Sequence, residues 1–267
     1  MRLPANFDVA RALAFLKARA IPGLEVVTES SYGRTITVQG RHHWLVCEFR
    51  GGRVDGSAVP QIRRIFDLDT DLEPFLRMAR RDQILAPLVR RRPGLRRPLL
   101  LDPFETAVRA IAGQLISVTA ATTLVARLVE RCGPRFGRTK RAFPSPDHLL
   151  RNQARIGPLG FPKSKVAAIL GIAEACHSGS LDWNFLAADP AAADVTLRAF
   201  TGIGPWTSAY IRWRGLGDLD AFPETDLGIR RAMSQSGIEP AQIRSRGEQW
   251  RPWRGLAVGH LWASLTD

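Results

Sequence analysis

The chain has 267 residues, with 38 Lys and Arg against 25 Asp and Glu, and a net charge of +13 at pH 7. Its hydrophobic content of 45% excludes a disordered or fibrous chain, and its length suffices for one large domain or two compact ones. No apolar run approaches the roughly 18 residues that span a bilayer, and the N-terminal residues do not resemble a signal peptide. We therefore expect a soluble cytoplasmic protein. Nucleic acid is the leading partner for its basic surface, and an anionic membrane surface is the second.

Residues 1–88 mix helical and strand patterns and predict an N-terminal α/β domain built on an antiparallel sheet. Residues 34–40 and 42–54 alternate in polarity and are joined by a turn, as in a pair of antiparallel strands. Residues 59–82 return to a helical pattern that is broken near Asp69 and Asp71. The residues that we expect to share a helix face are Leu13, Phe15, Leu16 and Ala20; those that we expect to share strand faces are Ile36 with Val38, and Trp44 with Val46 and Glu48.

A run of arginines around Pro93 and Gly94 follows, between two halves of different composition. Its position indicates a segment between domains, and the arginines are either a solvated connector or phosphate contacts. They are Arg90, Arg91, Arg92, Arg96 and Arg97.

From residue 89 to residue 267 the pattern predicts a second, mainly helical domain. Asp102 can cap a helix from Pro103 to near Gly113, with Glu105 completing a capping box. Further amphipathic helices, each with a cap or a breaker, are predicted within 116–133, 145–157, 163–179 and 189–200. The fold class is therefore mainly α.

The cysteines are too few and too scattered for a metal cluster. Cys47, Cys132 and Cys176 have no CxxC spacing and cannot supply the four thiolates of an iron–sulfur or Cys-only zinc site. We expect them to be buried, reduced and apolar in behaviour, and we expect no catalytic metal.

The most informative segment, LRAFTGIGPWTSAYIRW, spans residues 197–213. A helix ends at Phe200, and a new one begins at Pro205. Gly202 and Gly204 between them permit a tight hairpin and close approach of the backbone. The free N–H groups of the second helix then point outward and form a phosphate site that needs no basic side chain. A plain corner between two helices is the alternative.

Asp226 lies just before a predicted helix, in a loop opened by Pro223. An Asp at this position is commonly an N-terminal cap, which is the simplest interpretation. The second interpretation is chemical, because the carboxylate follows a glycine hairpin and an apolar helix in the chain.

This order resembles the helix–hairpin–helix plus Gly/Pro–Asp (HhH-GPD) signature of the DNA glycosylase superfamily, and most of all its AlkA-type 3-methyladenine-DNA glycosylase II family. The similar segments are 102–128 with its GQLISV element, 200–231 with GIGPWTSAY, and 250–262. The resemblance implies the helix–hairpin–helix DNA glycosylase fold. It implies a monomeric enzyme of the bacterial nucleoid that flips alkylated bases of the 3-methyladenine and 7-methylguanine type out of double-stranded DNA. It would hydrolyse their N-glycosidic bonds without a cofactor and leave abasic sites for base excision repair.

The same resemblance implies roles for individual residues. Asp226 is the catalytic carboxylate that stabilises positive charge on the sugar. The base pocket is formed by Trp206, Tyr210, Trp262 and Leu227. Leu115, with Gln114, is the wedge that enters the duplex. The hairpin backbone at Gly202, Gly204 and Thr207 holds a phosphate, with a monovalent cation at nearby carbonyls when DNA is bound. Candidate phosphate contacts, each with a solvated charge as its alternative, are Lys163, Lys165, Arg212 and Arg214.

The chain departs from related proteins at informative positions. Trp206 stands where bifunctional relatives carry a Schiff-base lysine, and no lysine follows residue 165, so we expect no abasic-site lyase activity. Leu227 and Gly228 stand where one member of the family has tyrosine and leucine, so we expect a roomier and less aromatic pocket there. A glycosylase for oxidised purines and a DNA-binding module without cleavage are the alternative functions.

Overall fold

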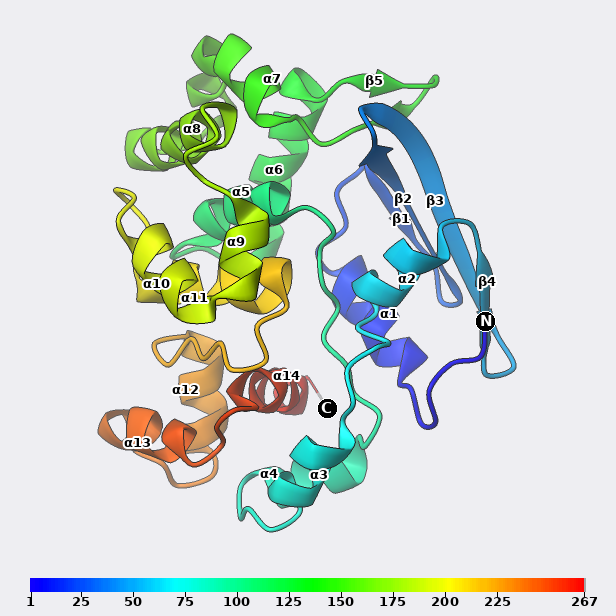
Figure 1. Ribbon diagram of the computed structural model, residues 1–267, viewed down its shortest axis with the longest axis vertical. Helices are drawn as coiled ribbons and strands as arrows, with labels where there is room; N and C mark the ends of the chain where they lie inside the picture. The colour runs from blue at the N-terminus through cyan, green and yellow to red at the C-terminus, as the bar shows by residue number, and fades with distance from the viewer. Residues whose placement is uncertain (267) are drawn as a thin grey trace.

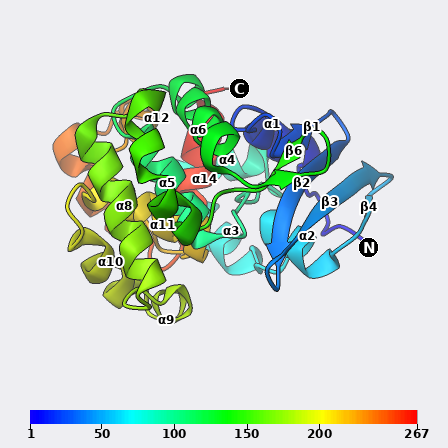
Figure 2. The same ribbon diagram turned by 90° about the horizontal axis from the view of Figure 1, so that it is seen from above.

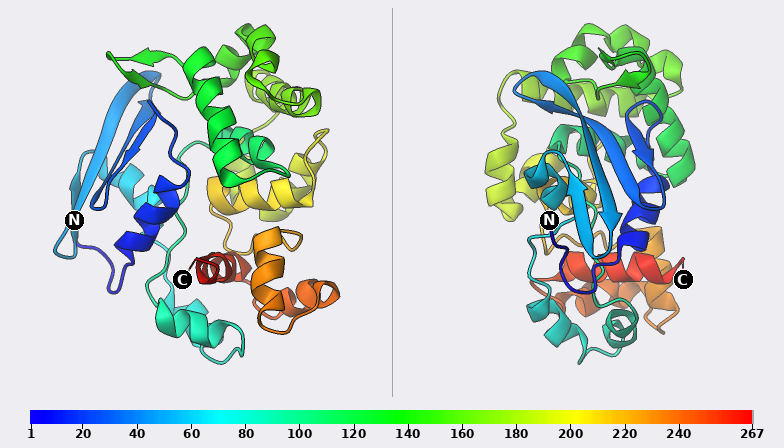
Figure 3. Two further views of the ribbon diagram at one scale, coloured as in Figure 1. Left: turned by 180° about the vertical axis from the view of Figure 1, so that it is seen from behind. Right: turned by 90° about the vertical axis from the view of Figure 1, so that its right-hand side faces the viewer.

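The computed structural model describes residues 1–266. A four-stranded antiparallel sheet lies along one side of an elongated molecule, and helices form the other side (Figure 1). The views from above, from behind and from the side show the same division into a sheet side and a helical side (Figures 2 and 3). The predicted fold class, mainly α with an N-terminal α/β portion, is therefore confirmed.

The sheet contains four strands in chain order, each antiparallel to the next. They are β1 (Glu25–Val27), β2 (Ser31–Val38), β3 (Arg41–Arg50) and β4 (Arg53–Gly56). Helices α1 (Val9–Lys17) and α2 (Val59–Ile65) pack on one face of the sheet in a shared apolar core. The buried residues of β3 are Leu45, Cys47 and Phe49. Trp44, Val46 and Glu48 do share a face as predicted, and that face is the outer one.

The prediction that Phe15 shares the inner face of α1 with Leu13 and Leu16 is wrong. Leu13 and Leu16 are buried in the core beneath the sheet. Phe15 instead lies on another side of the helix and packs against the core of the C-terminal helices. Helical spacing alone does not reveal that α1 is covered on two sides, because the second side is covered by a distant part of the chain.

The predicted break around Asp69 and Asp71 is confirmed, since α2 ends at Ile65 and the next helix begins at Glu73. Helices α3 (Glu73–Ala79) and α4 (Leu85–Arg91) follow the break. Their apolar side chains share one core with the C-terminal helices, where Phe75 and Leu85 are buried in the same cluster as Trp250 and Leu261. The end of the first predicted domain thus packs against the end of the second. The division at residue 88 stays a prediction.

The arginines that follow α4 are not all at the surface. Arg97 is 2% exposed, and its guanidinium donates to the Asp67 carboxylate at 3.1 Å and to the Asp218 carbonyl at 2.9 Å. Arg96 donates to the carbonyls of Asp67 and Thr70. For Arg96 and Arg97 the predicted choice between a solvated connector and phosphate contacts is therefore wrong, since both side chains satisfy carbonyls and a carboxylate inside the protein.

The helical half begins with α5 (Pro103–Gly113), which is almost wholly buried. Beside it and above it in Figure 1 lie α6 (Val118–Cys132), the hairpin β5 (Arg135–Phe136) and β6 (Lys140–Arg141), α7 (Pro146–Arg151), the turns η1 (Gln153–Arg155) and η2 (Gly157–Leu159), α8 (Lys163–His177) and α9 (Trp183–Ala188). Below it in the same view lie α10 (Pro190–Arg198) and α11 (Pro205–Ile211). A π-helical segment, η3 (Arg212–Leu216), prolongs α11. The lower half contains α12 (Leu227–Ser234), η4 (Pro240–Gln242), α13 (Ile243–Glu248) and α14 (Arg254–Ser264).

A buried ionic network joins the sheet to α5. Arg34 contacts Glu105 at 2.6 Å, and Arg109 contacts Glu25 at 2.6 Å and Glu105 at 2.7 Å. Burial by itself raises the pKa of Glu25, but the guanidinium groups of Arg109 and Arg34 outweigh it and lower this pKa to about 2. Arg109 also donates to the Arg19 carbonyl at 2.9 Å, so the network holds the end of α1 against α5.

Two smaller predictions need correction. Asp102 does cap α5, accepting from the Phe104 N–H at 2.8 Å, but Glu105 turns to Arg34 and Arg109 instead of closing a capping box. Cys47 and Cys132 are buried as predicted, whereas Cys176 is half-buried and lies beside the Trp183 indole N–H.

Within residues 1–266, no helix is both long and apolar enough to cross a membrane. In the same residues, no cluster of three or more His, Cys, Asp or Glu side chains could hold a metal ion.

Candidate functional site

The hairpin between α10 and α11 has the predicted form. Gly202 has a φ of +87°, in the left-handed region that favours glycine. Ile203 is buried and anchors the turn in the core, while Gly204 is the N-terminal cap of α11 and offers no side chain. The backbone at the start of α11 therefore lies at an exposed turn without a side-chain cap.

The loop between α5 and α6 lies directly beside this hairpin. Gln114 donates through Nε2 to the Gly202 carbonyl at 2.7 Å and to Thr207 Oγ1 at 2.8 Å. Thr207 is thus buried, and its side chain is engaged by Gln114. Leu115, the next residue, has a φ of +60° and its side chain is fully exposed. Local strain therefore presents an apolar side chain to solvent beside the hairpin.

The four candidate phosphate contacts differ in the structure. Lys165 is buried, and its ammonium donates to the carbonyls of Ala112 and Gln114 at 2.8 Å each. Arg214 is 2% exposed and donates to the Tyr210 hydroxyl. For Lys165 and Arg214, the prediction of a phosphate contact and the alternative of a solvated charge are therefore both wrong.

The remaining two candidates are closer to solvent. The Arg212 side chain is 15% exposed and pairs with Asp218 at 2.9 Å and with Asp194 at 3.5 Å, so it is also occupied within the protein. Lys163 is exposed at the start of α8 and stays a candidate.

Asp226 has the cap geometry and a second set of contacts. As N-terminal cap of α12, its Oδ1 accepts from the Ile229 N–H at 3.0 Å. The same atom accepts from Trp262 Nε1 at 2.8 Å, and Oδ2 accepts from Trp206 Nε1 at 2.8 Å. The two interpretations of Asp226 are thus compatible, because the cap bond leaves the carboxylate among aromatic side chains.

The aromatic residues named from the sequence meet around this carboxylate. Trp206 and Tyr210 are stacked, with ring centroids 5.4 Å apart and planes 20° from parallel. The ring centroids of Tyr210 and Trp262 are 6.2 Å apart. The Trp262 ring packs edge to face against Trp213, with centroids 4.9 Å apart. Leu227 is 79% exposed at the start of α12. The structure therefore brings the predicted aromatic residues into one row, Trp206–Tyr210–Trp262, and the indoles at both ends of this row donate to Asp226.

The expected extra space at Gly228 is absent. A Cβ atom at Gly228 would lie 3.0 Å from Asp226 Oδ1 and 3.1 Å from Trp262 Cδ1. The volume that a side chain would take at Gly228 is therefore filled by Trp262, whereas the less aromatic pocket expected from Leu227 stays a prediction.

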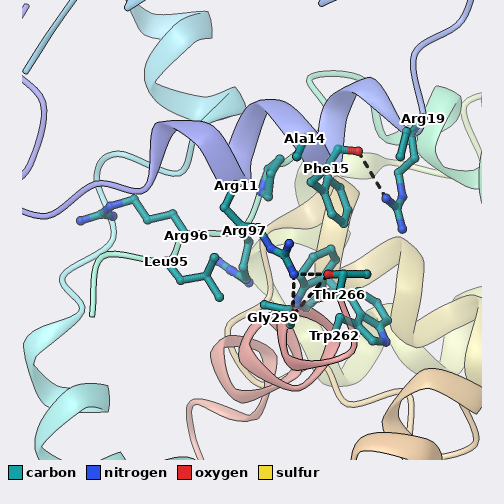
Figure 4. A pocket seen from close by; sticks show the side chains of 14 residues that line it. Arg11, Ala14, Phe15, Arg19, Leu95, Arg96, Arg97, Gly259, Trp262 and Thr266 are labelled. Carbon is teal, nitrogen blue, oxygen red and sulfur yellow. Dashed lines mark hydrogen bonds between the residues drawn. The ribbon is translucent and has the colours of Figure 1, made fainter. Parts of the chain in front are cut away.

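Sequence reasoning missed the contribution of α1. A cavity of about 240 Å³ lies between α1, residues 95–98 and α14, and Trp213 and Trp262 form part of its wall (Figure 4). Phe15 lines it from α1 and Arg19 from the turn that follows α1, and the Arg19 guanidinium lies 3.8 Å from the centre of the Phe15 ring. Their spacing of four residues, off the Leu13 and Leu16 side of the helix, is the signal that could have identified them.

Arginines also surround the Tyr210 phenol. Burial raises the pKa of Tyr210, but the charges of Arg214 and Arg19 outweigh it, so that the net pKa is lowered. Burial lowers the pKa of Arg19 itself. The surroundings of the Tyr210 hydroxyl are therefore electropositive, whereas the two indole N–H groups of the row face the Asp226 carboxylate.

Two family models match the chain. Residues 1–102 match the AlkA N-terminal domain, and residues 108–253 match the HhH-GPD superfamily of base excision DNA repair proteins. The chain is 35% identical to "DNA-3-methyladenine glycosylase 2" of Escherichia coli, over 96% of this chain and 93% of that protein.

A second relative is longer than this chain. The "probable bifunctional transcriptional activator/DNA repair enzyme AlkA" of Mycobacterium tuberculosis is 36% identical over 99% of this chain, which spans 57% of its length. Among solved structures, a 3-methyladenine DNA glycosylase from Archaeoglobus fulgidus has the same fold, with a TM-score of 0.81 at 23% identity, covering 98% of this chain and 96% of that one.

Proposed function

Because the chain belongs to the HhH-GPD superfamily of base excision DNA repair proteins, we propose that it is a monofunctional DNA glycosylase for alkylated bases. It removes bases of the 3-methyladenine and 7-methylguanine type from duplex DNA and leaves abasic sites. The observation that carries this proposal is the Asp226 carboxylate, which accepts hydrogen bonds from the two indole N–H groups at the ends of an aromatic row.

Hydrolysis of the N-glycosidic bond requires a carboxylate beside the sugar. When the N-glycosidic bond breaks, its electron pair leaves with the base and positive charge develops on the deoxyribose. Asp226 stabilises that charge, and a water molecule that adds to C1′ and loses a proton completes the hydrolysis. Three N–H donors, from Trp206, Trp262 and Ile229, hold the carboxylate in place before the reaction begins.

The aromatic row suits the base that is removed. A flipped base is held by stacking and by contacts at its edges, and alkylated purines of this type carry positive charge on the ring. Electron-rich faces such as those of Trp206, Tyr210 and Trp262 favour a cationic ring by about 1–2 kcal/mol. Since this preference is modest, the weakened glycosidic bond of the cationic nucleotide supplies much of the selectivity.

The proposal excludes cleavage of the DNA strand. A lyase step needs an amine that attacks C1′ and forms a Schiff base, and the hairpin position carries Trp206 in its place. Lys165, the last lysine of the chain, is buried and donates to two carbonyls. We therefore expect no covalent adduct to be trapped with borohydride.

We further propose how the protein engages DNA. Leu115 enters the duplex and fills the space of the flipped nucleotide, with Gln114 behind it. The hairpin backbone at Gly202, Gly204 and Thr207 contacts a phosphate. The Gly202 carbonyl keeps a lone pair beyond its bond from Gln114, which fits a monovalent cation when DNA is bound. The protein acts as a monomer at the nucleoid in the cytoplasm, and its net charge of +13 favours non-specific binding during the search.

Asp226→Asn tests this function. Asparagine caps helices about as well as aspartate, so the fold should be kept while the negative charge is lost. We expect release of 3-methyladenine and 7-methylguanine from defined duplexes to fall below detection, with the Kd for an abasic-analogue duplex within about threefold of wild type.

The matched control is Asp182→Asn, which alters the N-terminal cap of α9 in the same way. This control should release base at the wild-type rate. Base release by Asp226→Asn at the wild-type rate, or equal losses of binding and release, would leave Asp226 with a capping role alone.

A further inference from the structure

Gly228 lies in the first turn of α12, directly after the exposed Leu227. A Cβ atom built on it would lie 3.0 Å from Asp226 Oδ1, 3.1 Å from Trp262 Cδ1 and 3.2 Å from Trp262 Nε1. Contacts this short are rare in proteins, so any side chain at this position must displace the carboxylate, the indole or both. The hydrogen of Gly228 is therefore what lets the edge of Trp262 reach the start of α12.

This close approach permits a hydrogen bond from the Trp262 indole to Asp226. Trp262 Nε1 donates to Oδ1 at 2.8 Å, while Trp206 Nε1 donates to Oδ2 at 2.8 Å. The cap bond from Ile229 alone would hold one oxygen and leave the carboxylate free to turn about its axis. With an indole on each oxygen, the plane of the carboxylate is fixed as well.

Trp262 is itself held firmly. It lies on α14, which packs against α12 in the core that contains Ile229, Met233 and Leu261. Its ring meets Trp213 edge to face at 4.9 Å, and Trp213 is 1% exposed and donates to the Gly255 carbonyl at 2.7 Å. These packing contacts thus fix the position of the indole N–H that donates to Asp226.

We propose that Gly228 and the Trp262 indole N–H are positioning elements for Asp226, which fix its carboxylate in the orientation that the reaction needs. This proposal rests on the proposed glycosylase function. A carboxylate that is oriented in advance does not have to reorganise when charge develops on the sugar. Because misplacement by about 1 Å lowers rates roughly a hundredfold, a shift of a few tenths of an ångström should lower the rate about tenfold.

The experiment compares Gly228→Ala, Trp262→Phe and the double variant. Single-turnover base release is measured together with the Kd for an abasic-analogue duplex and with Tm. We expect each single variant to release base about tenfold more slowly, with little change in Kd for Gly228→Ala. The double variant should be no slower than the slower single variant, because both substitutions act on one hydrogen bond. Gly171→Ala, at a helix position where a Cβ meets open space, is the matched control.

A second measurement does not depend on activity. The Trp262 indole N–H resonance, assigned by its loss in Trp262→Phe, should shift in Gly228→Ala and exchange faster with solvent. Wild-type rates in Gly228→Ala, additive losses in the double variant, or an unchanged indole resonance would each overturn the positioning proposal. An inactive wild-type protein overturns the proposed function instead, and the resonance then decides the geometry on its own.

Discussion

Leu115 offers a test in which stability and DNA binding should respond differently to loss of the same side chain. Its side chain is fully exposed, so its removal should take nothing from the folded protein's core. Its φ of +60° is strained for a residue with a Cβ, by about 1–2 kcal/mol. Leu115→Gly relieves that strain but adds about 0.4–1 kcal/mol of entropy to the unfolded chain. The net effect on stability is therefore between zero and a gain of about 1.6 kcal/mol, and Tm should stay level or rise by up to about 6 °C.

The effect on DNA binding should have the opposite sign. If Leu115 fills the space of a flipped nucleotide, Leu115→Ala removes three carbon atoms from a buried position, at about 0.8 kcal/mol each. The loss of about 2 kcal/mol corresponds to a roughly thirtyfold weaker Kd. Fluorescence anisotropy with an abasic-analogue duplex measures it, and thermal unfolding of the free protein measures the stability.

The matched control is Val26→Ala, which trims a 54%-exposed apolar side chain on the sheet. It should change neither quantity. A Leu115→Ala protein that unfolds more than about 4 °C below wild type while keeping its affinity would show that Leu115 supports the fold and is not a wedge.

Two further predictions concern the interior. Arg97→Leu removes the charged partner of the buried Asp67 carboxylate and the donor to the Asp218 carbonyl, so it should destabilise the protein by about 3–5 kcal/mol in urea unfolding, whereas Arg50→Leu at the surface should change little. Burial lowers the pKa of His260 to about 4, so the folded protein holds this ring neutral. The contribution of the neutral His260 ring to the free energy of unfolding is complete above pH 6.5, the pKa of an unburied histidine, and this contribution is lost as pH falls toward 4. Wild type should lose on the order of 3 kcal/mol more than His260→Gln over that range in pH-dependent urea unfolding, and parallel curves would contradict this.

Local chemistry made several features predictable. Trp206 and Tyr210 stand four residues apart in one helix, so their rings had to lie on the same side, and they are stacked. The glycine hairpin and the caps at Asp102 and Asp226 follow from backbone preferences within a few residues. These features depend on neighbours in the chain, which is why the sequence reveals them.

Other features were predicted wrongly for one common reason. Arg97 and Lys165 looked like surface cations and are buried, because carbonyls from distant segments accept their hydrogen bonds. Gly228 looked like a source of space, and the indole of Trp262 occupies that space. In each case the deciding partner lies far away in the chain.

The sequence by itself determined the order of the elements, the hairpin, the position of the carboxylate at a helix start and the family to which the chain belongs. The tertiary structure alone decided that Phe15 and Arg19 line the cavity and that two indoles hold Asp226. Helical spacing and capping are set by residues within one or two turns, so they can be read along the chain. Which side chain fills a gap depends on how α1, α12 and α14 pack, and that packing is set by buried contacts between residues that are distant in the sequence.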